Sequence, residues 1–131
     1  MKNLILGGMS AVLSFFIYLL GGLDIALECL LIAIVVDYIS GMIKAYTTKT
    51  LSSRIGYKGV LKKVGIIAIV TLSVLLDRIT GEHGAIRTLV IYYFVANEGL
   101  SILENLAAAG VPIPEVISNT LQNLKNKKEG K

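Results

Sequence analysis

The chain has 131 residues, of which 54% are hydrophobic, and its mean hydropathy is +0.72. Soluble domains contain about 45–50% apolar residues. A single soluble core of this size could not hold the four long apolar segments of the sequence, so we expect an integral membrane protein. The formal net charge of +4 would suit nucleic acid or an anionic membrane surface. Because the basic residues lie between the apolar segments, we expect anionic phospholipids as partners and no nucleic acid.

Four segments are expected to cross the membrane as helices, which takes about 20 residues each. The first carries no charge, and we interpret it as a retained helix because its apolar run is longer than that of a signal peptide. The third contains only a short uncharged stretch and reaches spanning length if Lys62 and Lys63 extend to the membrane surface. In chain order the segments are Leu4–Gly22, Asp24–Tyr46, Val60–Ile79 and Ala85–Ala109.

A short amphipathic helix is expected after the fourth segment. Pro114 suits the first turn of a helix, and Glu115 interacts favourably with the dipole at its start. The apolar side chains that follow form a weak stripe, which consists of Val116, Ile117, Leu121 and Leu124. The sequence therefore predicts an all-α polytopic membrane protein with about four transmembrane helices. Residues 1–111 are predicted to form the transmembrane domain, and residues 112–131 a cytoplasmic amphipathic helix with a basic tail.

The basic residues predict the orientation, because Lys and Arg concentrate on the cytoplasmic side of membrane proteins. Six lie in the connection between the second and third segments, four in the tail and one at Lys2, against Arg78 and Arg87 on the other side. An even number of crossings then places both termini in the cytoplasm. We expect residues 52–59 to be a solvated connector on the headgroups. The candidate contacts for anionic lipid are Arg54, Lys58, Lys62, Lys63, Lys125, Lys127 and Lys128.

Polar side chains also occur within the expected spanning helices, where ionisable groups are costly and are therefore candidates for function. Five of them in the fourth segment share an arc of about 120° on a helix, opposite apolar side chains. This stripe should face other helices or water and not lipid. It is either a hydrogen-bonded seam between helices or a surface that lines a pore or contacts another copy. Its members are Asn97, Glu98, Ser101, Glu104 and Asn105.

Asp37 and Lys44 are the corresponding candidates in the second segment. Asp37 lies 13 residues after Asp24, about 20 Å along a helix, and Lys44 follows two turns later on nearly the same face. Asp37 either pairs with a basic residue of the neighbouring connection or contributes to a pore or oligomer contact.

The sequence contains no pattern typical of catalysis. No nucleophile–base pair or phosphate-binding loop accompanies the carboxylates. Cys29 is the only cysteine and His83 the only histidine. We therefore expect no disulfide, no metal site, no cofactor and no enzymatic activity.

Several motifs resemble those of the phage lysis and toxin-secretion holins of Gram-positive bacteria and their phages. The most specific is Asn97-Glu-Gly-Leu-Ser-Ile-Leu-Glu-Asn105, followed by Gly110-Val-Pro-Ile-Pro114. The others are Asp37-Tyr-Ile-Ser-Gly-Met-Ile-Lys-Ala-Tyr46, Leu51-Ser-Ser-Arg-Ile-Gly-Tyr-Lys-Gly59 with Lys62-Lys63, and Arg87-Thr88-Leu89. Together they cover about residues 30–118.

The resemblance implies a protein that oligomerises with itself in the bacterial cytoplasmic membrane and opens holes there at a set time. Its passenger would be a cell-wall-degrading endolysin or, in some clostridia, a large toxin. One alternative is a small four-helix ion or drug transporter subunit, although such exporters usually carry an essential Glu in the first helix, and the first segment here has no ionisable residue. Another is an adaptor that regulates a different membrane complex.

Overall fold

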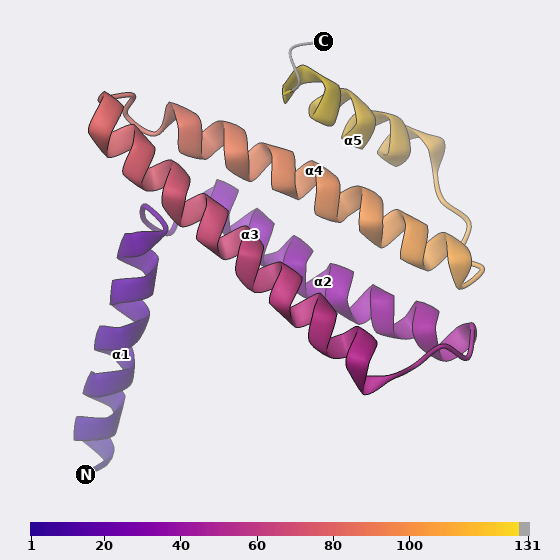
Figure 1. The fold of residues 1–131 in the computed structure, drawn as a ribbon, viewed down its shortest axis with the longest axis horizontal. Helices are drawn as coiled ribbons and strands as arrows, with labels where there is room; N and C mark the ends of the chain where they lie inside the picture. The colour runs from indigo at the N-terminus through magenta and orange to yellow at the C-terminus, as the bar shows by residue number, and fades with distance from the viewer. Residues whose placement is uncertain (129–131) are drawn as a thin grey trace.

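The computed structural model describes residues 1–128, with side chains as far as residue 126, and this part of the chain folds into five helices without strands (Figure 1). The expected lipid contacts of Lys127 and Lys128 therefore fall on side chains outside the described part, and Lys131 of the predicted tail lies outside the described residues. The helices are α1 (Lys2–Leu19), α2 (Ile25–Thr47), α3 (Ser53–Thr80), α4 (Ala85–Ala108) and α5 (Glu115–Lys128).

The first four helices are long and apolar enough to cross a membrane. This result confirms the predicted all-α class with four spanning helices and a shorter C-terminal helix. The bounds of α3 differ from the prediction, because α3 begins at Ser53 and the solvated connector expected over residues 52–59 is almost entirely helical. The side chain of Ser52 caps this helix by accepting a hydrogen bond from the Ile55 amide at 3.2 Å. Hydropathy marks only the apolar part of a helix, so it could not reveal these basic first turns.

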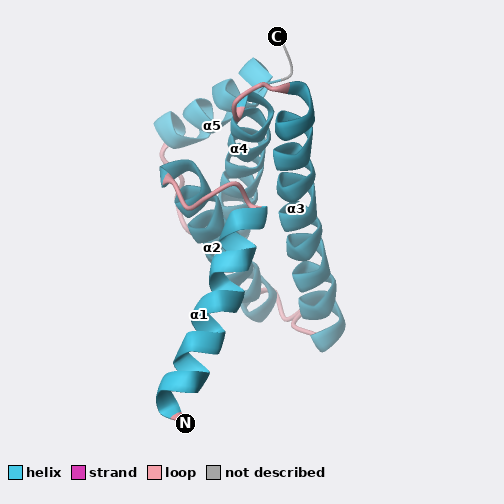
Figure 2. Ribbon diagram, turned by 90° about the vertical axis from the view of Figure 1, so that its left-hand side faces the viewer, coloured by secondary structure: helices cyan, strands magenta, loops and turns pink. Residues whose placement is uncertain are grey.

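Helix α4 lies at the centre of the packing. It contacts α2 most extensively, then α5 and α3, whereas α2 and α3 touch each other little (Figures 1 and 2). A cluster of six buried apolar residues lies where α2, α3 and α4 meet the residue that follows α1: Leu20, Leu27, Leu30, Ile66, Val70 and Ile91. Lipid chains are as apolar as these side chains, so close packing and polar contacts between the helices carry much of the specificity.

Helix α1 points away from the other helices (Figures 1 and 2) and contains no buried residue. Near its C-terminal end the guanidinium of Arg78 in α3 lies over the ring of Tyr18, 4.5 Å from the ring centre. Arg78 Nη2 also donates a hydrogen bond to the Tyr18 carbonyl at 3.4 Å. Along the rest of α1 the large apolar side chains are exposed.

Helix α5 runs back along the C-terminal half of α4 (Figure 1). The closest approach is at Gly99, where an added Cβ would lie 2.9 Å from Leu121 Cδ2. The side of α5 that is partly buried carries Ser118, Leu121, Leu124 and Lys125. Leu121 and Leu124 of the expected apolar stripe thus lie against the protein, whereas Val116 and Ile117 are exposed.

Candidate functional site

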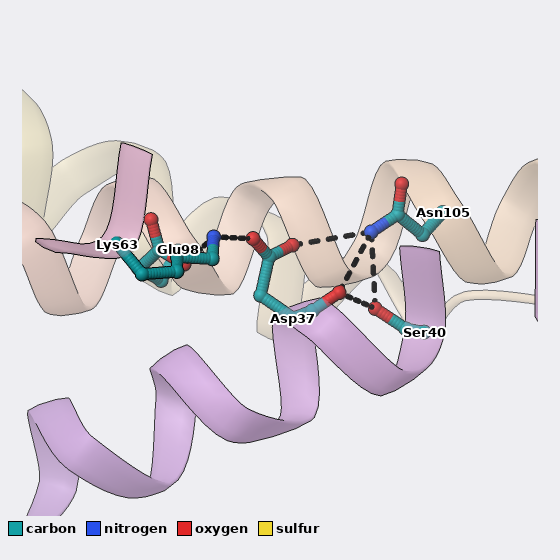
Figure 3. Close-up of polar contacts among 5 residues, drawn as sticks. All are labelled: Asp37, Ser40, Lys63, Glu98 and Asn105. Atoms are coloured by element: carbon teal, nitrogen blue, oxygen red, sulfur yellow. Dashed lines mark hydrogen bonds and ion pairs between the residues drawn. The ribbon is translucent and has the colours of Figure 1, made fainter. Parts of the chain in front are cut away.

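Polar groups, most of them buried, form two clusters at different levels of the α2–α3–α4 bundle. The first, which we name the Lys63 cluster, consists of Asp37, Ser40, Lys63, Glu98 and Asn105 (Figure 3). The second, the Arg87 cluster, joins the starts of α2 and α4 to the end of α3, and consists of Leu20, Gly22, Asp24, Asp77 and Arg87.

In the Lys63 cluster one ammonium group serves two carboxylates from different helices. Lys63 Nζ of α3 forms ion pairs with Asp37 Oδ2 of α2 and, at 2.6 Å, with Glu98 Oε2 of α4. The side chains of Asp37 and Glu98 are only 8% and 5% exposed, so water contributes little to their solvation. Lys63 therefore ties together three helices that would otherwise each bring an unpaired charge into the bundle.

Asn105 completes this cluster from one face of α4 (Figure 3). Its Nδ2 donates to Asp37 Oδ1 at 3.1 Å and to Ser40 Oγ at 3.0 Å. The Ser40 hydroxyl in turn donates to the Asp37 carbonyl at 3.0 Å. These contacts fix the Asp37 carboxylate from the side opposite Lys63, so that both of its oxygens have a partner.

A pocket of about 750 Å³ opens beside the Lys63 cluster. Asp37, Lys63, Ser101 and Asn105 form its polar part, and the rest of its wall is mainly apolar and comes from α2, the α2–α3 connection and the first turns of α3. A second hollow of about 400 Å³ lies farther along the gap between α2 and α3. The two helices therefore stand apart in front of α4, and the polar cluster borders the space between them.

The Arg87 cluster holds the turn between α1 and α2 against α4. Arg87 donates from Nε to the Leu20 carbonyl at 2.6 Å, from Nη2 to the Gly22 carbonyl at 2.8 Å, and from Nη1 to Asp24 Oδ2 at 2.7 Å. Asp77 of α3 caps α4 by accepting hydrogen bonds from the Arg87 amide and its neighbour, both at 2.9 Å. The guanidinium and the two carboxylates thus join all four long helices at this end.

Gly21 is needed for the close approach of this turn to Arg87. Its φ of +85° lies in the left-handed region, and an added Cβ would be 2.6 Å from Arg87 Nε and 2.8 Å from Arg87 Cδ. The neighbouring Gly22 also has a positive φ but open space around it. Only at Gly21, therefore, are both the backbone conformation and the contact with Arg87 lost if a side chain is added.

The ion pair with Arg87 gives a testable pH dependence through Asp24, which precedes α2. The hydrogen bond from Arg87 lowers the pKa of the Asp24 carboxyl below its ordinary value of 3.8, and the Leu27 amide contributes in the same direction. A lowered folded-state pKa stabilises the fold above the unfolded-state pKa, and this contribution is lost as the pH falls through the folded-state pKa.

We expect the difference in melting temperature between the wild type and Asp24→Asn in detergent to be largest near neutral pH. It should shrink progressively as the pH falls below about 4. Glu28→Gln, which removes an exposed carboxylate in the next turn, is the matched control and should show a much smaller difference. A wild-type advantage over Asp24→Asn that stays constant down to the lowest pH would contradict this assignment.

The polar side chains of the predicted stripe on α4 have different surroundings in the structure. Glu98 and Asn105 meet Asp37 in the Lys63 cluster, and Ser101 lines the adjacent pocket. Asn97 is partly buried, whereas Glu104 and Lys44 are exposed. The structure therefore does not bring Lys44 into the cluster with Asp37.

Lys63 was expected at the membrane surface with the other basic residues, and the structure places it elsewhere. Its ammonium lies between two buried carboxylates, Asp37 of α2 and Glu98 of α4. Of the other candidate lipid contacts, Arg54, Lys58 and Lys62 are exposed and Lys125 is partly buried.

Sequence reasoning missed the Arg87 cluster. Arg87 counted toward the charge distribution and the family resemblance but not as a structural contact, although it is one of just two basic residues at its end of the helices and acidic Asp24 and Asp77 lie at the same end. That coincidence of opposite charges was an available signal. Among residues 1–128, no group of three or more His, Cys, Asp or Glu side chains could hold a metal ion.

Comparison with known proteins gives similarity over most of the chain. The model of the bacteriophage holin family matches residues 14–126. An uncharacterised 14.9 kDa protein of Clostridium perfringens is 43% identical over 128 residues, which cover 96% of each chain. The uncharacterised protein YqxH of Bacillus subtilis is 38% identical over 113 residues, 86% of this chain and 80% of its own. A protein of Bacillus phage phi105 named as a probable holin is 35% identical over 105 residues, 80% of this chain and 78% of its own. No solved structure matches.

Proposed function

Because the chain belongs to the bacteriophage holin family, we propose that it oligomerises in the bacterial cytoplasmic membrane and opens holes there. The passenger is an endolysin that degrades the cell wall or a large toxin that leaves the cell. Both termini and the connection between α2 and α3 lie in the cytoplasm, because the basic residues gather at those parts of the chain.

The observation that supports this proposal best is the Lys63 cluster. A water-filled hole needs polar surface, and a single copy in lipid must keep that surface hidden. Asp37, Lys63 and Glu98 satisfy one another inside the bundle. If copies assemble and α2, α3 and α4 separate, the same groups become available to water. A single copy can thus stay closed with these groups buried, and the same groups can line a hole after the helices separate.

The remaining candidates fit this proposal as contacts between copies. Glu104 and Lys44 are exposed on spanning helices, where a charged side chain in lipid is costly. A neighbouring copy or a wet hole would remove that cost. We assign the exposed basic residues Arg54, Lys58 and Lys62 to anionic headgroups, each contributing about 1 kcal/mol of attraction.

The transporter alternative has less support. A four-helix exporter needs an ionisable group on the path of its substrate, and α1 carries none between Asn3 and Leu19. The buried carboxylates Asp37 and Glu98 are both paired with Lys63.

Expression together with a cytoplasmic endolysin in a bacterium tests the proposal. We expect abrupt lysis that depends on both proteins and releases the enzyme into the medium. Leu should replace Glu98 and Glu104 in separate variants, with Glu98→Gln and Glu104→Gln as controls that keep hydrogen bonding. Wild-type lysis timing for both Leu variants at equal membrane abundance would exclude these carboxylates from the hole. Absence of enzyme release from the wild type would exclude the holin proposal itself.

A further inference from the structure

The exposed charges of α2 and α3 lie close together along the helix axes. On α3, exposed Lys62 and Arg78 are 16 residues apart, and on α2, exposed Glu28 and Lys44 are also 16 residues apart. At a rise of about 1.5 Å per residue, each pair encloses an apolar belt of about 24 Å. The hydrocarbon core of a typical bilayer is thicker, at about 30 Å.

The charged residues of the Lys63 and Arg87 clusters show a similar spacing along the helices. Lys63 and Asp77 are 14 residues apart on α3, which is about 21 Å, and Asp37 and Asp24 are 13 residues apart along α2, which is about 20 Å. A surface lysine can extend its side chain toward the headgroups. Lys63 cannot do so, because it is held between two carboxylates within the bundle.

Helix α1 differs from the bundle in this respect. Its 18 residues extend about 27 Å, and the chain carries no charge from Asn3 to Leu23. A bilayer of ordinary thickness therefore suits α1 better than it suits α2 and α3. The short belt belongs to the bundle and not to the chain as a whole.

We propose that the α2–α3–α4 bundle fits a hydrocarbon layer of about 24 Å, so that an ordinary bilayer must thin around each copy. Thinning has a free-energy cost that grows with the mismatch and with the perimeter exposed to lipid. When copies associate, each exposes less of its perimeter to lipid, and the total cost of thinning falls. The mismatch therefore favours self-association in the membrane. The mismatch acts through the lipid around the bundle and favours association whether or not the assembly opens a hole.

Reconstitution in vesicles of graded thickness tests the proposal. The full chain is labelled on Cys29, the single cysteine, which is exposed, with donor or acceptor dye. Vesicles contain phosphatidylcholine and phosphatidylglycerol in fixed proportion, with monounsaturated chains of 14, 18 or 22 carbons. We expect the association constant from energy transfer to be lowest in the 14-carbon lipid and to rise about tenfold toward the 22-carbon lipid, since mismatch costs fractions of a kcal/mol per Å. A flat response, or the weakest association in the 22-carbon lipid, would overturn the proposal.

A matched pair of variants separates belt length from charge. Lys62→Leu lengthens the part of α3 that carries no exposed charge by one turn, to Lys58, and should move the weakest association toward longer lipid chains. Arg54→Leu removes an exposed positive charge from the same helix outside the belt and should leave the lipid dependence unchanged. Equal shifts for both variants, or none for Lys62→Leu, would contradict the inference. Circular dichroism of each variant verifies that the helices are intact. A thickness dependence without enzyme release in cells would refute the holin proposal and leave this one standing.

Discussion

Replacing Lys63 by Met is expected to destabilise the bundle by about 3–5 kcal/mol, because it leaves two buried carboxylates without their cation. Met keeps most of the length and apolar stem of Lys, so the change tests the charge more than the packing. The measurement is reversible unfolding in mixed detergent micelles, followed by helical content. The same variant should open holes earlier in cells, since the closed bundle is the state that Lys63 stabilises.

Two further variants test whether the loss of stability comes from the ion pairs of Lys63. Lys62→Met changes the neighbouring residue, which is exposed, and should alter stability by no more than about 0.5 kcal/mol. Asp37→Asn with Glu98→Gln in the Lys63→Met background removes the stranded charges and should recover part of the loss. Equal stability of Lys63→Met and Lys62→Met would show that the ion pairs of Lys63 contribute nothing to the closed bundle.

Arg87→Met should have an effect of similar size, about 3–5 kcal/mol. The change removes donors from two backbone carbonyls and from Asp24, and Leu20, which carries one of these carbonyls, is buried. We also expect the turn over residues 20–24 to lose protection in amide hydrogen exchange, because Arg87 is its main attachment to α4.

Arg78→Met is the control at the same end of the bundle. Arg78 is exposed and contacts Tyr18 over its ring and at its carbonyl, which should contribute about 1 kcal/mol or less. If both arginine variants lose stability equally, the hydrogen bonds of Arg87 are not what anchors the turn.

The helices could be predicted from the sequence because crossing a membrane imposes a length and a hydropathy that few segments satisfy. The ends were harder to predict where polarity changes within one helix. Helix α3 begins two turns before its apolar part, since Ser52 caps it there and basic residues are acceptable outside the hydrocarbon region.

Several members of the Lys63 cluster were visible in the sequence, and a pairing of Asp37 with a basic residue of the α2–α3 connection was one of two readings. The sequence did not show which basic residue this would be, and the structure pairs Asp37 with Lys63. Asp37, Glu98 and Asn105 stood out as polar residues at membrane depth. Which basic residue would reach them depends on the rotation and the offset of α3 relative to α2 and α4. Periodicity gives neither quantity, so Lys63 was assigned to the membrane surface with the neighbouring Lys62.

The isolation of α1 bears on how freely its sequence can change during evolution. Side chains that contact no other part of the chain are constrained by little more than their solubility in lipid. Exchanges among Leu, Ile, Val, Phe and Met along most of α1 would leave every contact of the two clusters unchanged. The family model matches only from residue 14, which leaves most of this helix outside that model. Selection would then act on the composition of α1, and on residue identity only at its C-terminal end, where Tyr18 meets Arg78 and the chain turns at Gly21 to meet Arg87.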